Sequence, residues 1–145
     1  FMEIMINWWA VIVSAVVSIV IGSLWFGPIF GKKWMEVMGV DKATEAEKKE
    51  MMNNAVMLYV LQFVLSIVTI YVLAHYIVGW QPQPGAWGGI TNALWIWLGF
   101  IMPTLAGNAM WSGKTKRLAR NMFLINAGYN FVLYIVFGAI LGGWM

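Results

Sequence analysis

Cysteine is absent from this sequence, histidine occurs once, and only 10% of the 145 residues are charged. Without cysteine the chain cannot be a small domain held together by disulfides. Soluble domains carry about 25% charged residues, and a domain this small leaves much of its surface exposed. Because 61% of the residues are hydrophobic, that surface would be largely apolar in water. The shortage of charge therefore excludes a soluble globular domain and predicts an integral membrane protein with a single domain, 1–145.

Long apolar stretches occupy most of the chain. Each is close to the roughly 20 residues that a helix needs to cross a bilayer, and none has the short alternating pattern of a β-barrel strand. A water-soluble four-helix bundle would need a polar stripe on every helix, which these stretches lack. The predicted fold is therefore all-α and polytopic, with transmembrane helices at about 4–26, 55–78, 87–111 and 122–144.

The basic residues indicate the orientation of these helices. All nine Lys and Arg lie in two loops, 27–54 and 112–121, and loops rich in Lys and Arg stay in the cytoplasm. Both loops are then cytoplasmic, and both termini lie on the other side of the membrane. The net charge of +3 is explained by these orientation signals and by attraction to anionic membrane lipids. It does not require a nucleic-acid partner.

Small residues recur at steps of four in the first and fourth predicted helices. Such stripes let another helix approach closely. The partner helix can belong to the same bundle or to a second copy in a homodimer, and the sequence leaves both uses open. The residues predicted to pack in this way are Ala10, Ser14, Ser18 and Gly22 in the first span and Gly138 and Gly142 in the fourth.

Several polar residues fall within the cytoplasmic half of the predicted spans. Amide side chains inside a membrane are costly when unpaired, so they face the protein interior or water. Hydrogen bonds between helices are their common use. The alternative is a cytoplasm-facing polar pocket for a small molecule or a lipid headgroup. That pocket would be lined by Trp25, Gln62, Asn108, Asn126 and Asn130.

Groups that carry chemistry are scarce. Proton relays and ion-coupled carriers use Asp, Glu, Lys or Arg inside the membrane, and the predicted spans contain none. Hydrolysis inside the membrane requires paired acids, a Ser–His arrangement or a metal. We therefore expect no enzymatic activity, no cofactor and no metal ion. His75 lies near the outer end of the second span, where a hydrogen bond to a carbonyl and a pH-sensing role both stay open.

A distinctive motif follows the first span. Its residues Trp25-Phe26-Gly27-Pro28-Ile29-Phe30-Gly31-Lys32-Lys33-Trp34-Met35 resemble the signature of a bacterial membrane family known as domain of unknown function 1761. Shorter motifs at 97–100 and 124–129 are similar to later parts of that family. The resemblance implies a four-helix protein of the prokaryotic cytoplasmic (inner) membrane and brings no established activity.

The same motif predicts a short helix in the membrane interface. Gly27 and Pro28 would end the first span at the membrane surface, Phe30 and Trp34 would anchor the chain there, and Lys32 would reach lipid phosphates. Gly31 belongs to the same interfacial motif. A structural turn is favoured here over a binding site.

The sequence thus leaves two functions to compare. The first is a membrane protein that binds or passes a small molecule or lipid through the cytoplasm-facing pocket. The second is a non-catalytic assembly or accessory subunit that acts through helix–helix association along the stripe of the first span.

Overall fold

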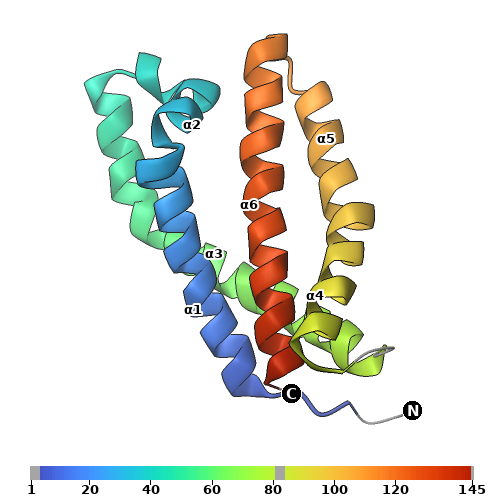
Figure 1. Ribbon diagram of the computed structural model, residues 1–145. Coiled ribbons are helices and arrows are strands. Elements are labelled where there is room, and N and C mark those ends of the chain that lie inside the picture. The colour runs from blue at the N-terminus through green and yellow to red at the C-terminus, as the bar shows by residue number, and fades with distance from the viewer. Residues whose placement is uncertain (1–3, 81–83, 145) are drawn as a thin grey trace.

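The computed structural model describes residues 4–80 and 84–144, and the regular structure in these ranges is entirely helical (Figure 1). The α-helices are α1 (Trp8–Leu24), α2 (Gly31–Met38), α3 (Glu45–Gly79), α4 (Gly85–Ile96), α5 (Met102–Met110) and α6 (Lys116–Gly143). Two π-helical turns, η1 (Trp25–Ile29) and η3 (Trp97–Ile101), and one 3₁₀ turn, η2 (Val40–Lys42), connect some of them.

Four rods in the described residues are long and apolar enough to cross a membrane, which confirms this part of the predicted fold class. The α1 helix runs directly into η1, and α4, η3 and α5 form a second composite rod of 26 residues, Gly85–Met110. The α3 helix has 35 residues and is about 52 Å long. Because the hydrocarbon core is about 30 Å thick, the charged first turns of α3 extend beyond it.

The short helix α2 follows the first rod, as the sequence predicts, and it ends at Gly39 in the left-handed conformation with φ of 74°. Its position in the membrane interface stays a prediction. Thr44 then caps α3, because its hydroxyl accepts a hydrogen bond from the Glu47 amide at 3.2 Å. This cap separates the α2 segment from the long helix that follows.

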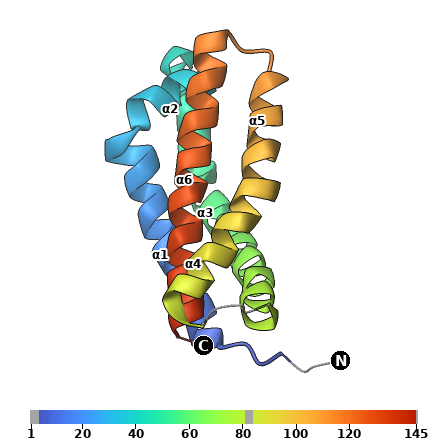
Figure 2. The same ribbon diagram turned by 45° about the vertical axis from the view of Figure 1, so that its right-hand side comes forward.

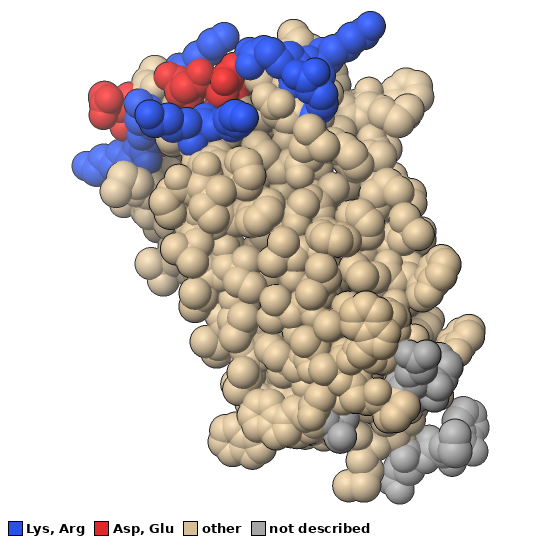
Figure 3. All heavy atoms as spheres, in the orientation of Figure 1, with Lys and Arg blue, Asp and Glu red and all other residues tan. Residues whose placement is uncertain are grey.

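The α6 helix lies between α1 and the α4–α5 rod (Figures 1 and 2). The first and last described segments meet at one end of the bundle, where the Asn7 side-chain amide donates to the Trp144 carbonyl at 2.8 Å. The charged side chains in view gather at the opposite end (Figure 3). We call these the terminal end and the charged end.

Close contact between backbones fixes α4 against α6. A Cβ atom added to Gly138 would lie 2.5 Å from the Gly89 carbonyl oxygen, and one added to Gly142 would lie 2.9 Å from the Gly89 Cα. Both distances are too short for any side chain. Glycine at these positions therefore lets the two helices pack backbone to backbone, as small residues do between membrane helices.

The two π-helical turns occur beside prolines. Pro28 lies inside η1, and Pro103 follows η3 in the first turn of α5. A proline has no N–H to donate, and its ring collides with the carbonyl four residues earlier. A wider turn relieves that collision: in η1 the Phe30 amide donates to the Trp25 carbonyl, five residues back, at 2.9 Å. The rods are thus locally widened at these points without being interrupted.

Each π-helical turn also begins with a tryptophan that holds α6. The Trp25 indole donates to the Ile125 carbonyl at 3.0 Å, and the Trp97 indole donates to the Ala127 carbonyl at 3.2 Å. Residues two apart on an α-helix point in nearly opposite directions. The α6 helix is therefore held from two sides, once from the first rod and once from the third.

The stripe of small residues on α1 faces the interior of the chain. Ala10, Ser14 and Ser18 are buried, and the Ser18 carbonyl accepts a hydrogen bond from the Tyr129 hydroxyl of α6 at 3.3 Å. A Cβ atom added to Gly22 would meet the same hydroxyl at 2.9 Å. The Ser14 hydroxyl is fully buried and has no hydrogen-bond partner among the described residues. Helices α3 and α6 occupy this face of α1.

We predict that Gly138→Ala lowers the free energy of unfolding by about 1–3 kcal/mol, the usual cost of overpacking. The added methyl group meets the α4 backbone, which cannot move aside as a side chain would. Titration of the detergent-solubilised protein with dodecyl sulfate, followed by circular dichroism, measures the change. Gly107→Ala is the control, because a Cβ there has no neighbour within 4 Å and alanine favours a helix. Equal effects of the two substitutions would contradict the packing described.

Candidate functional site

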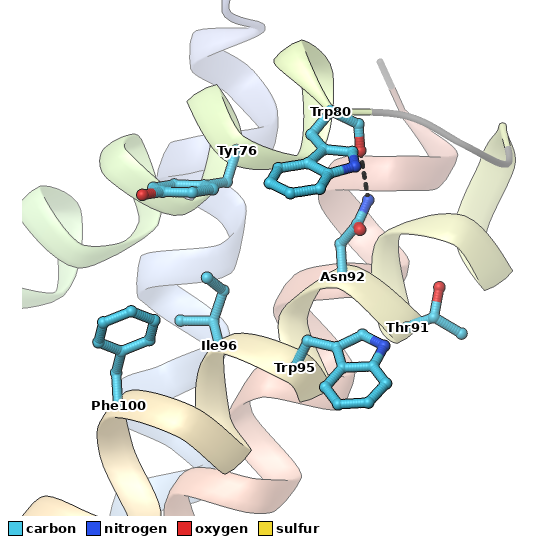
Figure 4. A pocket seen from close by; sticks show the side chains of 7 residues that line it. All are labelled: Tyr76, Trp80, Thr91, Asn92, Trp95, Ile96 and Phe100. Atoms are coloured by element: carbon cyan, nitrogen blue, oxygen red, sulfur yellow. Dashed lines mark hydrogen bonds between the residues drawn. The ribbon is translucent and has the colours of Figure 1, made fainter.

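A cavity of about 530 Å³ separates the last turns of α3 from α4 and η3 near the terminal end (Figure 4). Tyr76 and Trp80 line it from α3. From the opposite wall the lining residues are Thr91, Asn92, Trp95, Ile96 and Phe100. We call this cavity the outer chamber. Its volume lies within the range of cavities that hold small organic ligands.

The polar groups of the outer chamber lie toward the terminal end. The Asn92 side-chain amide donates to the Trp80 carbonyl at 2.9 Å, as the dashed line in Figure 4 shows. This bond joins the end of α3 to α4 across the segment that links them. The Thr91 hydroxyl donates to the Gly88 carbonyl at 3.0 Å, so it is satisfied within its own helix. The chamber is therefore closed by polar contacts at one end and lined by rings farther in.

A second cavity of about 210 Å³ continues from the first toward the middle of the bundle. It shares Tyr76, Ile96 and Phe100 with the outer chamber, and we call it the inner chamber. Its other lining residues are Thr69, Val72 and Leu73 from α3 and Tyr134 from α6. Because three residues belong to both chambers, the two chambers are adjacent. Together we call them the lateral groove, which lies between α3 and the third rod.

The lateral groove opens to the side of the bundle. Trp95 and Phe100 are 72% and 66% exposed although they line it. In a bilayer, the surroundings of these rings would be lipid chains. The η3 turn contributes Phe100 to the wall, and the sequence spacing of Asn92, Ile96 and Phe100 at steps of four follows one face of the third rod.

The chemistry of the lateral groove is uncharged. Its described lining residues are aromatic or aliphatic side chains together with hydroxyl groups and one amide. None of these side chains carries a charge at neutral pH. The groove can therefore bind apolar chains and rings and donate hydrogen bonds, but it offers no partner to an ionic group.

The charged end has cavities of its own, and charged side chains of both signs line them. One of about 270 Å³ lies between α2 and the start of α6 and includes Lys42, Lys114 and Arg117 together with Glu36 and Asp41. The Arg117 guanidinium donates to the Glu36 carboxylate. This hydrogen bond and the attraction between the two opposite charges lower the pKa of Glu36 and raise the pKa of Arg117. The pair links α2 to α6 and leaves both charges accessible to water.

The polar residues that the sequence places in a cytoplasm-facing pocket are bonded mainly within their own helices. On α3, the Gln62 side-chain amide nitrogen is 3.4 Å from the Ser66 hydroxyl. On α6, the Asn130 side-chain amide donates to the Asn126 backbone carbonyl at 2.9 Å. Asn108 is exposed on α5. The chambers described above are lined by none of these residues.

Trp25, the fifth residue of that set, belongs to an aromatic cluster instead. Its ring lies 4.9 Å from Phe30 and 6.4 Å from Tyr129, and Phe26 contacts both Trp34 and Tyr129 with centroid separations of 4.9 and 5.0 Å. The signature motif thus fixes the turn between α1 and α2 against α6. Aromatic pairs in this geometry contribute about 0.5–1.5 kcal/mol each beyond their burial.

The glycines of the motif differ in their surroundings. A Cβ atom added to Gly31 would lie 3.1 Å from the Phe26 carbonyl oxygen, whereas one added to Gly27 would meet no atom within 4 Å. Gly31 therefore lets α2 begin close under the π-helical turn. Lys32 is exposed at the charged end and lines a separate cavity beside the start of α3.

His75 is bonded locally. Its Nδ1 atom lies 2.8 Å from the Tyr71 carbonyl oxygen of the preceding turn, and its ring packs edge-on against the Tyr71 ring at 4.4 Å. A hydrogen bond of this kind requires the proton on Nδ1. Of the two roles left open for His75, this geometry corresponds to the hydrogen bond to a carbonyl.

Residues of the lateral groove were not singled out by the sequence as a site. Trp80 suggests only a membrane interface, and Tyr76, Asn92 and Tyr134 stand far apart in the chain. One feature of the sequence could have indicated part of the groove: Thr69, Leu73 and Tyr76 have the spacing of residues on one face of a helix. That spacing marks a face of one helix, but it does not indicate which other helix stands opposite.

Comparison with known proteins identifies a family. A family model described as "Protein of unknown function (DUF1761)" matches residues 9–142, from the first turn of α1 to the last turn of α6. No curated protein and no solved structure matches the chain. The match agrees with the resemblance drawn from the motif after the first span.

The Glu36–Arg117 pair makes a pH-dependent prediction. Because the pKa of Glu36 is lowered by folding, its contribution to stability is present above the ordinary glutamate pKa of about 4.3. The contribution is lost as the pH falls through the lowered value. We expect wild type to melt slightly above Glu36→Gln at pH 7, and we expect this difference to shrink as the pH falls below about 4.3. Thermal melts over a series of pH values measure the difference. If the difference in melting temperature between wild type and Glu36→Gln does not change with pH, the Glu36–Arg117 pair does not stabilise the fold as described.

Proposed function

Because this chain belongs to the DUF1761 family of proteins of unknown function, we propose its function from its own geometry: it binds one lipid molecule in the lateral groove. The observation that carries the proposal is that the outer and inner chambers adjoin, because both are lined by Tyr76, Ile96 and Phe100. A side-opening groove on a membrane-length bundle can receive a molecule directly from the bilayer.

The lining of the lateral groove favours an apolar or uncharged part of that lipid. Trp95 and Phe100 offer exposed rings, which pack well against chains and ring systems. Asn92 and Thr91 supply polar groups toward the terminal end, where the interface of the membrane would lie. A lipid would therefore place its apolar part along η3 and its more polar part beside Asn92.

We propose binding without catalysis at this groove. Acid–base chemistry uses groups whose pKa lies near the working pH, and nucleophilic chemistry uses a hydroxyl or thiol next to a base. The hydroxyls of Thr69, Thr91 and Tyr134 have no such base among the lining residues. What the lining supplies is a surface for apolar contact and a few hydrogen-bond donors.

The orientation in the membrane follows from charge. We propose that the charged end is cytoplasmic, because the positively charged loops of membrane proteins stay on that side. The terminal end and the lateral groove then lie toward the outer leaflet of the prokaryotic cytoplasmic membrane. In this orientation α2 lies in the cytoplasmic interface, with Lys32 toward lipid phosphates and Phe30 toward the hydrocarbon.

The groove is preferred here over the cytoplasm-facing pocket as the ligand position. Gln62 and Asn130 use their amides within their own helices, whereas the lateral groove has room for a ligand. Passage of a small molecule toward the cytoplasm would require a path past these amides. Their role in the proposal is to stabilise α3 and α6 inside the membrane.

A role as an assembly subunit is the second candidate, and one observation favours it. The first half of α3 is exposed over most of its circumference, as Val56 and Leu58 illustrate with 75% and 60% exposure. Gln62 lies on the same segment and is exposed as well. Amides on membrane helices form bonds to other helices. A partner or a second copy would thus contact α3, because the α1 stripe is already covered by α3 and α6.

Filling the inner chamber tests the lipid proposal. Val72→Trp places a large ring into a space of about 210 Å³, and we expect it to displace the bound lipid. Native mass spectrometry after mild detergent extraction measures the lipid retained per chain. Wild type is expected to keep one lipid. Val68→Trp is the matched control, since Val68 is equally exposed one turn earlier on α3 and does not line either chamber. Loss of lipid in both variants, or in neither, would contradict binding in the groove.

Because the chain has no cysteine, single cysteines test the orientation cleanly. In intact cells, a membrane-impermeant maleimide should label Pro84→Cys at the terminal end and spare Lys49→Cys at the charged end. Lys49→Cys should react only after the cells are opened. The reverse pattern would contradict the proposed orientation and leave the lipid measurement unaffected.

A further inference from the structure

Two hydroxyl groups in the inner chamber have no protein partner. Tyr134 is only 5% exposed and lines the chamber, yet its hydroxyl makes no hydrogen bond to any residue that the structure describes. Thr69 stands on the α3 side of the same chamber. Its side chain is exposed, and its hydroxyl has no hydrogen-bond partner within residues 4–80 and 84–144. The hydroxyl of Tyr129, on the same helix as Tyr134, by contrast has a partner, because it donates to the Ser18 carbonyl at 3.3 Å.

An unpaired hydroxyl inside a membrane protein is unfavourable. Buried polar groups almost always have a partner, and a buried donor without one carries the cost of its lost hydration. Apart from Tyr76, which the inner chamber shares with the outer one, the remaining walls are Val72, Leu73, Ile96 and Phe100, whose side chains accept no hydrogen bonds. A ligand that brings an acceptor into this chamber would remove that cost.

We propose that the inner chamber binds the carbonyl oxygen of an uncharged lipid, with Tyr134 as the principal donor and Thr69 as the second. This inference rests on the proposed function of the lateral groove and names its ligand class. One carbonyl oxygen has two lone pairs and accepts from both hydroxyls. A carbonyl brings no proton of its own, so both hydroxyls can act as donors to it.

The absence of charge from the groove excludes an ionic headgroup at this depth. A phosphate would require Lys, Arg or several aligned N–H donors. All nine Lys and Arg of the chain fall within residues 32–49 and 114–120, and the described lining of both chambers is neutral. A neutral lipid meets this condition along the whole groove. Either an ester of a glycerolipid or a ring carbonyl of an isoprenoid quinone meets this requirement.

Tyr76 and Trp95 extend the site beyond the carbonyl. They line the outer chamber, and Tyr76 also borders the inner one. The remainder of the ligand would pack against these rings on its way to the bilayer. The carbonyl bond would thus fix the depth of the ligand, while the aromatic wall would supply most of the contact area.

Paired ligands test this inference. Dissociation constants are measured for the purified full chain in detergent micelles with three probes: 1,2-dioleoylglycerol, its dioleyl ether analogue without carbonyls, and a quinone with a short isoprenoid tail. Wild type is expected to bind one of the carbonyl probes about tenfold more tightly than the ether, the effect of one net hydrogen bond. Preference for the ester identifies a glycerolipid, and preference for the quinone identifies a quinone.

Two conservative variants assign that preference to the chamber. Tyr134→Phe removes the hydroxyl and keeps the ring, so the carbonyl probe should lose about tenfold in affinity while the ether keeps its affinity. Tyr129→Phe is the matched control, because its hydroxyl bonds to α1 outside the groove, and it should keep the preference. Thr69→Val should reduce the preference in part.

The outcomes separate this inference from the proposed function. If wild type binds the ester, ether and quinone equally and Tyr134→Phe changes nothing, the carbonyl site is wrong, whereas lipid loss in Val72→Trp still supports the groove. Equal losses in Tyr134→Phe and Tyr129→Phe would also overturn it, because both would then report only on stability. If no probe binds and Val72→Trp retains as much lipid as wild type, both proposals fail.

Discussion

Direct contact between the backbones of α4 and α6 is the constraint on which the rest of the structure depends. Gly89, Gly138 and Gly142 leave no space for side chains at this contact, so the third and fourth rods meet at the terminal end. The Trp97 indole then reaches the Ala127 carbonyl from the same side, and Trp25 reaches Ile125 from the other. The α6 helix becomes the fixed centre, and the surrounding rods are positioned by their contacts with it.

The lateral groove is a consequence of that arrangement. With α4 held against α6, α3 packs mainly on α1 and makes fewer contacts with α4. The lateral groove lies between α3 and the third rod, where side chains border the space. The η3 turn before Pro103 places Phe100 at the edge of this space. Proline, which would weaken a helix in water, here shapes the wall of a cavity. Stability and the candidate site thus arise from neighbouring parts of one rod.

Sequence and structure agree on the elements and differ on which residues meet. Apolar runs predict four membrane-length helices. Gly39 marks the end of α2 and Thr44 marks the start of α3. These features can be predicted because hydropathy and capping depend on the local sequence. The groove could not be predicted in this way. Tyr76, Ile96 and Tyr134 come together only through the order in which helices pack. The grouping of Gln62 and Asn126 in a cytoplasm-facing pocket rests on their positions along the predicted spans, and such positions do not indicate which helix faces stand opposite each other.

Intermolecular NMR contacts test the central claim, lipid binding in the lateral groove, most directly. In lipid nanodiscs with methyl-labelled protein, the account predicts strong nuclear Overhauser effects from one slowly exchanging lipid to the methyl groups of Val72, Leu73 and Ile96. Residues on the open face of α3, such as Val56, should show only the weak contacts of bulk lipid. Equal, weak contacts at all of these positions would contradict the account, because the groove would then be only another part of the lipid-facing surface.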